Sequence, residues 1–186
     1  MGSTRWTSSP RTYRGRNLDA VASEVKLLAR HRIRVLVSSD NNCYATKFGG
    51  QGNPNWMAID DGLPSTGASQ GFPACYNSND PGMGRAWDHF WANSPGPDDR
   101  GLQDHYARGW ALLASRLRRL SSVLGYDTLN EHWAGIAAPS CDQPAGCPVF
   151  DQNELTPYTT RVAHAIHTAA PKALVFGEPN IQFDYA

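Results

Sequence analysis

The stretch from Val123 to Gly135 restricts the fold more than any other part of the sequence. Its first half, Val123 to Leu129, has the aliphatic and aromatic content of a strand buried on both faces, which is typical of a parallel sheet covered by helices. The strand then breaks off into a polar run: Asn130, Glu131, His132 and Trp133. Barrel enzymes carry their catalytic side chains at the carboxyl ends of strands. The run therefore fits either a catalytic strand end or a plain loop with one capping glutamate.

Two further segments repeat this change from apolar to polar. Ile33 to Val37 is short and β-branched, and the polar residues 38–42 follow it directly. Ala173 to Phe176 predicts a third buried strand, and it is followed by Gly177, Glu178, Pro179 and Asn180. Because parallel strands end at the same edge of a sheet, these polar runs should share one face. The sequence thus favours a site over isolated loop residues.

Helical periodicity fills the segments between the predicted strands. Helices are expected at residues 17–31, at residues 84–92 and at Leu155 to Ala169. Another helix is expected after Asp98 and Asp99, with a core stripe from Tyr106 to Leu120. Alternating helices and strands predict an α/β fold with a parallel sheet and right-handed crossovers. The polar N-terminal segment, residues 1–16, is predicted to be a loop or a frayed end.

Several polar side chains fall outside the apolar stripes of these helices. Gln103 and His105 lie off the stripe that contains Tyr106, so we expect them to be solvated. His164 and His167 have a metal-like spacing, but they fall on the polar side of their helix, which favours a solvated pair.

Composition excludes some classes of function. The chain has 186 residues, 40% of them hydrophobic, and no formal net charge, so it can bury one core and offers no electrostatic footprint for a nucleic acid. No apolar run is long enough to span a bilayer, and Met1 to Trp6 lacks the apolar segment of a signal peptide. We expect no cofactor.

The four cysteines indicate disulfides more than metal. Cys141 and Cys147 flank a short loop that a disulfide can close if the Cα atoms come within about 7 Å of each other. Cys43 and Cys75 remain as the second pair by elimination. A zinc site is the alternative, but the sequence has no Cys-x-x-Cys and His132 is the only nearby imidazole, so we expect no metal.

Specific motifs carry a resemblance to a known enzyme family. The run from Gly125 to Gly135 resembles the acid/base strand of glycoside hydrolase family 5, whose motif is Asn-Glu-Pro. Five other segments resemble the endoglycoceramidase branch of this family in particular: residues 47–56, 87–91, 101–106, 146–151 and 178–180. The similarity runs in register from about Asn17 to the C-terminus. It implies that residues 17–186 form part of a TIM barrel, roughly its third to fifth βα units, and that the reaction is a retaining hydrolysis of a β-glycosidic bond.

The resemblance also implies roles for individual residues. Glu131 matches the acid/base, which protonates the leaving oxygen and later activates a water molecule. Asn130 matches the residue that binds the 2-hydroxyl of the sugar, and Trp133 follows the motif, where an aromatic ring can wall the pocket. Asp40 and Asn42 fall where the third strand of the family ends in His-Gln-Asp, and we expect them to contact substrate.

Two departures from the family pattern bear on this assignment. Asn42 is a neutral amide where the family has Asp, so it is a poorer acceptor for sugar hydroxyls. His132 stands at the proline of the motif, which removes a restriction on the backbone just after Glu131. Tolerated loop variation explains His132 best, and tuning of the pKa of the acid is the functional alternative.

The family's nucleophile, a glutamate at the end of the seventh strand, has no counterpart in the sequence. We therefore expect an interior part of a barrel, since a whole one needs about 250 residues, with no activity of its own unless another chain supplies the missing strands. Glu178 is no substitute by family pattern.

The substrate class that the resemblance implies is a glycan or glycolipid. The alternatives are a non-catalytic remnant that binds carbohydrate or glycolipid, and a truncated product without activity. The resemblance and the cysteine pairs imply secretion.

Overall fold

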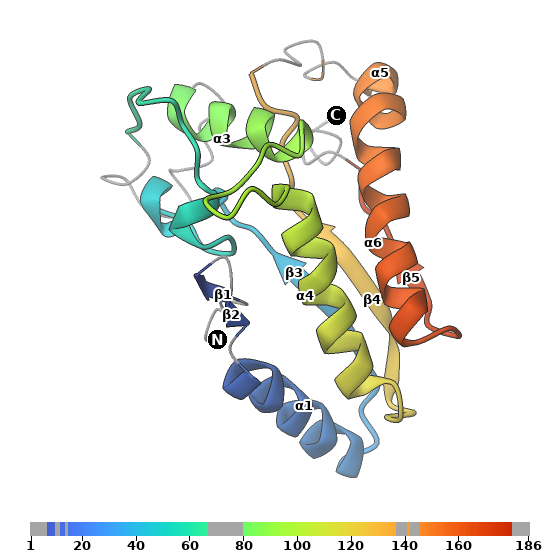
Figure 1. Ribbon diagram of the computed structural model, residues 1–186. Coiled ribbons are helices and arrows are strands. Elements are labelled where there is room, and N and C mark those ends of the chain that lie inside the picture. Colours follow the sequence, from blue (N-terminus) through green and yellow to red (C-terminus); the bar gives the residue numbers. More distant parts are fainter. Residues whose placement is uncertain are drawn as a thin grey trace.

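The structure is built around a small parallel sheet with helices packed along it (Figure 1). It is a computed structural model that describes residues 7–9, 12–13, 15–66, 80–136, 141 and 146–179. The sheet contains β3 (Val35–Asp40), β4 (Val123–Asn130) and β5 (Val175–Phe176), in the order β3-β4-β5. All pairs in this sheet are parallel, as the sequence predicts.

The register of β3 against β4 brings their carboxyl ends together. Asp40 lies opposite Asn130, and Ser38 lies opposite Asp127. Two residues of β3 therefore span the same length as three residues of β4, which is a β-bulge. The strand β3 begins two residues later than predicted and includes residues 38–40. The first part of the polar run therefore belongs to the strand itself and not to a loop after it.

Helices connect the strands in the order that the sequence predicts. The main helices are α1 (Gly15–Arg30), α3 (Pro81–Trp91), α4 (Leu102–Leu117) and α6 (Thr156–Ala169). The short helix α5 (Pro148–Phe150) and a π-helical turn, Asp151–Leu155, lead directly into α6. Two short 3₁₀ turns, Thr46–Phe48 and Asn55–Met57, interrupt the segment between β3 and α3. Figure 1 shows α4 and α6 side by side along the sheet, in agreement with their close packing.

Local sequence explains how α3 begins and which side it buries. Asp80 caps the helix by accepting a hydrogen bond from the backbone nitrogen of Met83 at 2.9 Å, and Pro81 occupies the first position. Trp87, Phe90 and Trp91 are buried, as predicted. Their rings pack edge-on or stacked against each other and against Tyr44, Tyr106, Phe150 and Tyr158. This aromatic core joins α3 to α4 and α6.

The prediction that Gln103 and His105 are solvated is wrong. Gln103 is buried, and its side-chain nitrogen donates to the carbonyl oxygens of Phe90 and Trp91 at 2.9 and 3.0 Å. The Nε2 atom of His105, also buried, lies 2.8 Å from Oδ1 of Asp98. The spacing of apolar residues predicts which side of a helix is buried. It cannot predict that Gln103 and His105 are buried too, because their hydrogen-bond partners come from other segments.

The N-terminal segment also differs from the prediction. Within the predicted loop 1–16 the structure has two short antiparallel strands, β1 (Thr7–Ser9) and β2 (Thr12–Tyr13), and α1 already begins at Gly15. A two-residue pairing of this kind contributes little stability by itself.

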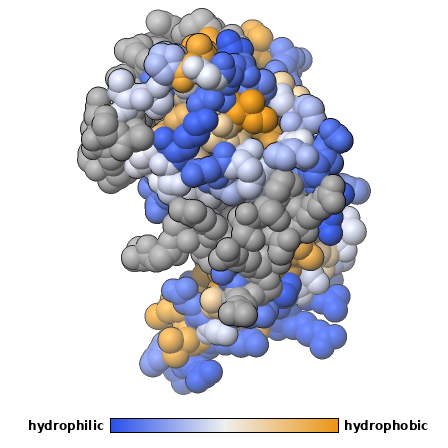
Figure 2. Space-filling model, turned by 60° about the vertical axis from the view of Figure 1, so that its left-hand side comes forward, coloured by the Kyte–Doolittle hydropathy of each residue, from blue (hydrophilic) through white to orange (hydrophobic). Residues whose placement is uncertain are grey.

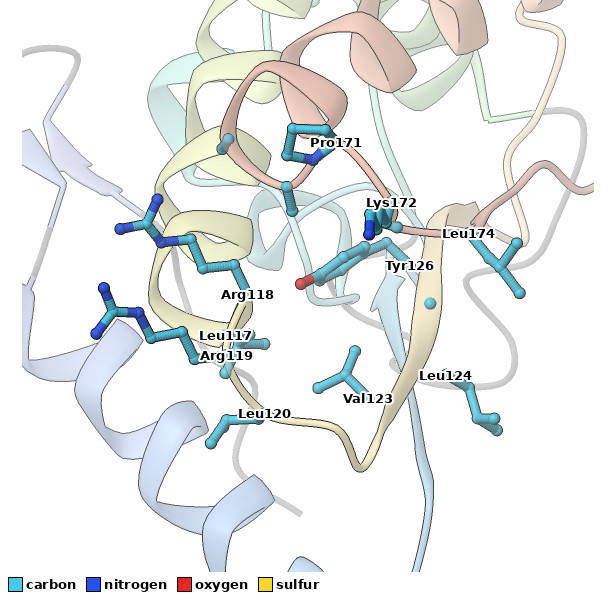
Figure 3. Close-up of a pocket in the computed structure, with 14 residues that line it drawn as sticks. Leu117, Arg118, Arg119, Leu120, Val123, Leu124, Tyr126, Pro171, Lys172 and Leu174 are labelled. Atoms are coloured by element: carbon cyan, nitrogen blue, oxygen red, sulfur yellow. The ribbon is translucent and has the colours of Figure 1, made fainter.

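The face of the sheet that is turned away from the helices is apolar and open to solvent among the described residues. Leu174 is 60% exposed and Phe176 is 43% exposed, which corrects the prediction that the third strand is buried. In Figure 3 the side chains of Leu124 and Leu174 point away from the helices, whereas Val123 and Tyr126 point toward them. On another side of the molecule, Figure 2 shows separate groups of hydrophobic residues among hydrophilic ones. The strand β5 is exposed because it is an edge strand of the described sheet.

Candidate active site at the carboxyl ends of the strands

The three predicted polar runs do meet at one edge of the sheet. Asp40 ends β3 and Asn130 ends β4, and the register of the sheet places them opposite each other. Glu178 follows two residues after the end of β5. Each strand thus contributes one polar side chain at its carboxyl end, which is where barrel folds hold their sites.

The side-chain amide of Asn130 lies between two carboxylates. With its nitrogen turned toward Glu178, it donates to Oε2 at 2.9 Å and to Oε1 at 3.3 Å. In the opposite orientation the nitrogen would face Oδ1 of Asp40 at 3.5 Å, the outer limit of a hydrogen bond, and the amide oxygen would face the carboxylate of Glu178. We therefore place the nitrogen toward Glu178, because this orientation pairs a donor with an acceptor.

Asp40 is held from the other side by two amides. The side-chain nitrogen of Asn42 donates to Oδ2 of Asp40 at 3.2 Å, and that of Gln51 donates to the same oxygen at 3.3 Å. Asn42 therefore belongs to the polar cluster and contacts Asp40 directly, while its predicted contact with substrate stays a prediction. The amide of Asn42 holds the carboxylate of Asp40 in place. A carboxylate at position 42 would instead repel it.

Glu131 directly follows the end of β4 and has a strained backbone. Its φ is +53°, in the left-handed region that residues other than glycine seldom adopt. Strained conformations of this kind cluster at functional sites. A proline at position 132 would favour extended backbone for residue 131. The histidine at that position is therefore compatible with the left-handed turn in a way that the family's proline would not be.

His132 turns into the interior. It is fully buried, and its Nδ1 lies 3.2 Å from the carbonyl oxygen of Leu129. The ring packs between Trp91 and Phe150. Burial lowers the pKa of His132 from 6.5 to about 4, although the hydrogen bond to Leu129 acts in the opposite direction. The imidazole is thus neutral at neutral pH, and it brings no positive charge to the neighbourhood of Glu131.

Trp133 is also buried, with 9% of its surface exposed. Its backbone oxygen accepts a hydrogen bond from Nε1 of Trp91 at 2.7 Å, which ties the end of the site loop to α3. The ring forms part of the hydrophobic core. A role in lining the sugar pocket stays a prediction.

Cavities lie at both ends of the sheet. At the carboxyl end an open cavity of about 320 Å³ is lined by Glu178 together with residues of the π-helical turn and the start of α6. A larger cavity of about 490 Å³ lies at the opposite end, between the last turns of α4 and α6 and the start of β4 (Figure 3). None of the predicted site residues lines the larger cavity. Size alone therefore does not locate the site.

The remaining chemical predictions concern the pairing of the cysteines and the absence of a metal site. Cys141 and Cys147 form a disulfide with their Cα atoms 4.6 Å apart, as predicted. Cys43 is disulfide-bonded, whereas its predicted partner, Cys75, lies outside the described residues. Within the part of the chain that the structure describes, no group of three or more His, Cys, Asp or Glu side chains is arranged to hold a metal ion. The same part contains no helix long and apolar enough to cross a membrane.

The link between Glu178 and Asn130 was not foreseen from the sequence. The position of Glu178 after a predicted strand relates it only to the nucleophile, for which it is no substitute by family pattern. The available signal is that polar residues occur at or just after the ends of three neighbouring strands. Sequence could not show, however, which two of these side chains are in contact.

The chain is similar to known proteins. No family model matches the chain. It is 29% identical over 167 residues to endoglycoceramidase I of Rhodococcus hoagii, covering 90% of this chain and 32% of that protein. It is similar to the structure of endo-glycoceramidase II from Rhodococcus sp., with a TM-score of 0.75, 29% identity and coverage of 96% of this chain and 39% of that one.

The homologues of the chain are endoglycoceramidases. These are enzymes of glycoside hydrolase family 5, so the resemblance carried by the motifs is confirmed. The α/β fold is similar to part of the endoglycoceramidase TIM barrel. Further structures of endo-glycoceramidase II are a lactosyl-enzyme intermediate and a complex with ganglioside GM3, each with a TM-score of 0.76 and 27% identity, covering 96% of this chain and 40% of that chain. The chain spans about a third of the length of the curated relative.

Proposed function

We propose that the chain contributes the acid/base half of a retaining glycosidase that cleaves the β-glycosidic bond of glycolipids. The observation that carries the proposal is the junction of Asn130 and Glu131 at the end of β4, within the aligned part of the endoglycoceramidases. The ganglioside complex and the lactosyl-enzyme intermediate of one relative support a glycolipid substrate and a covalent intermediate.

Glu131 carries out the proton transfers of this reaction, and the other side chains bind the sugar or support the site. Glu131 donates a proton to the oxygen that joins glycan to lipid, and afterwards takes a proton from the attacking water. Asn130 and Asp40 bind sugar hydroxyl groups beside it, and Asn42 holds Asp40. Trp133 supports the loop from the core side through its link to Trp91.

Retention requires a second carboxylate about 5–5.5 Å from the first, across the bond that is cleaved. We place this nucleophile in the remaining barrel strands, because the match covers 39% of the related barrel chain and the motifs of the sequence resemble roughly the third to fifth units of the barrel. The remaining strands would pack on the apolar sheet face that carries Leu174 and Phe176. The disulfide between Cys141 and Cys147 supports a secreted protein, since such bonds persist in oxidising compartments.

Glycan release tests this proposal directly. The purified chain alone should not release glycan from a fluorescent ganglioside, whereas the chain joined to the missing strands of a relative should do so. Glu131→Gln in the joined protein should lower kcat at least about 100-fold, because general acid catalysis contributes about that much. Glu24→Gln, at an exposed position of α1, serves as the matched control and should leave the rate unchanged.

Three results would contradict the proposal. Turnover by the chain alone, abolished in Glu131→Gln, would show that the chain already contains the nucleophile. Equal rates for the joined protein and its Glu131→Gln variant would remove Glu131 from the reaction. If Glu131→Gln retained sugar affinity while neither protein turned over, the binding-remnant alternative would take the place of the enzyme.

A further inference from the structure

We infer that Glu178 is a positioning residue for Asn130, and that it fixes which end of the amide faces the substrate. An asparagine side chain presents a donor at one end and an acceptor at the other, and the two ends have nearly the same shape. Shape therefore cannot select the orientation. A fixed partner on one side must do so, and the structure places a carboxylate there.

The geometry favours Glu178 as that partner. Both of its oxygens are within hydrogen-bond distance of the amide nitrogen, at 2.9 and 3.3 Å. Hydrogen bonds to an ionised acceptor are about twice as strong as those between neutral groups. On its other side the amide is 3.5 Å from Asp40, whose Oδ2 already accepts from Asn42 and Gln51. The strong contact thus lies toward β5 and the weak one toward β3.

The orientation has a chemical consequence for the ligand. With the nitrogen held by Glu178, the amide oxygen faces Oδ1 of Asp40, so two acceptors lie side by side at the end of the sheet. Neighbouring acceptors are satisfied by a ligand that donates from neighbouring hydroxyl groups. This step rests on the proposed function: the hydroxyl on the sugar carbon next to the cleaved bond would act as a donor to Asn130.

Glu178 is well placed to act in this way, because it lies at the rim of the sheet and not in the aromatic core. It is partly exposed and lines the open cavity at the carboxyl end of the sheet, beside Thr156 and Thr159. It follows an edge strand of only two residues, Val175–Phe176. Its carboxylate therefore positions Asn130 without supporting the aromatic packing beneath the site.

Side-chain amide NMR tests the contact without any need for turnover. In a ¹⁵N-labelled chain, the amide pair of Asn130 is identified by its loss in Asn130→Asp. Its proton shifts should change as carboxyl groups titrate. This change should vanish in Glu178→Gln and persist in Asp40→Asn. Persistence in Glu178→Gln, or loss in Asp40→Asn, would overturn the inference.

A second measurement covers the case in which Glu178→Gln does not fold. In the wild-type chain, the ¹³C titration of the Glu178 carboxyl should have the same midpoint as the Asn130 amide shift. A midpoint shared with the carboxyl of Asp40 instead would overturn the inference.

Sugar binding then tests the consequence for the ligand. In the protein joined to the missing barrel strands, methyl β-lactoside should bind more tightly than its 2-deoxy-2-fluoro analogue, because fluorine cannot donate. Glu178→Gln should reduce that ratio toward one, and an unchanged ratio would contradict the assigned polarity. If neither sugar binds, the proposed function fails, while the NMR result still decides the contact.

Discussion

At the scale of single residues, the most informative feature is the left-handed backbone of Glu131. A side chain at a φ of +53° costs roughly 1–2 kcal/mol relative to ordinary backbone, so the position stores strain at the proposed catalytic acid. Such a cost persists only where the surroundings enforce it. Here the surroundings are β4 on one side and the buried His132 on the other.

Replacing Glu131 with glycine should relieve this strain. We expect Glu131→Gly to be more stable than Glu131→Ala by about 1 kcal/mol, because glycine adopts positive φ readily. Urea unfolding of both variants measures the difference. At Glu154, within the π-helical turn, the order should be reversed, with alanine the more stable. Equal stability of the two Glu131 variants would show that the turn is not strained.

The buried His132 should make stability depend on pH. The unfolded chain binds a proton there below about pH 6.5, whereas the folded chain does so only below about pH 4. The neutral ring therefore contributes fully above pH 6.5, and this contribution is lost as the pH falls from 6.5 to 4. At about 1.4 kcal/mol per pKa unit, the loss is about 3 kcal/mol at most.

Urea unfolding at pH 7 and pH 5 measures this effect. His132→Phe should flatten the dependence, because phenylalanine fits the aromatic surroundings and cannot take up a proton. The same substitution at the exposed His164 should leave the dependence unchanged. A dependence as steep in His132→Phe as in wild type would assign the effect to other groups.

At the scale of elements, the strands and helices were largely predictable, but their polar contacts were not. The strand β4 follows from its apolar content; it begins at Val123, as predicted, and ends at Asn130, one residue later than predicted. Gln103 and His105 were misplaced because their partners, residues 90, 91 and 98, precede the helix itself. The exposure of β5 was missed because a strand's own residues do not show whether it has a second neighbour.

The joint between α3 and α4 gives a prediction at this scale. Gln103 donates to two carbonyl oxygens at the end of α3 and also accepts from Arg161 on α6. Gln103→Leu should therefore destabilise the fold by about 1–3 kcal/mol, since it leaves buried polar groups without a partner. The urea midpoint measures this loss. Gln152→Leu, at an exposed position, should change stability by less than about 0.5 kcal/mol, and a similar loss at both positions would contradict the role of Gln103.

At the scale of the whole molecule, the open apolar face of the sheet should control self-association. Leu174 and Phe176 are exposed beside an edge strand, which is a surface that other chains can pair with. The double variant Leu174→Ser with Phe176→Thr should bind less hydrophobic dye and remain monomeric at higher concentration. Val149, 71% exposed but on α5, is the control, and Val149→Ser should have little effect. Equal effects of both changes would indicate general surface hydrophobicity.

Because of the bulge between β3 and β4, the number of residues in β4 matters more for the site than the identity of its side chains. Two residues of β3 match three of β4 just before Asp40 meets Asn130. Deleting one residue from 128–129 would let two residues of β4 match two of β3, so Asn130 would still lie opposite Asp40, but the bend and extra twist of the bulge would be lost. In descent from a common ancestor, many side chains of β4 could change. A gain or loss of one codon here would change the direction in which β4 delivers the proposed acid.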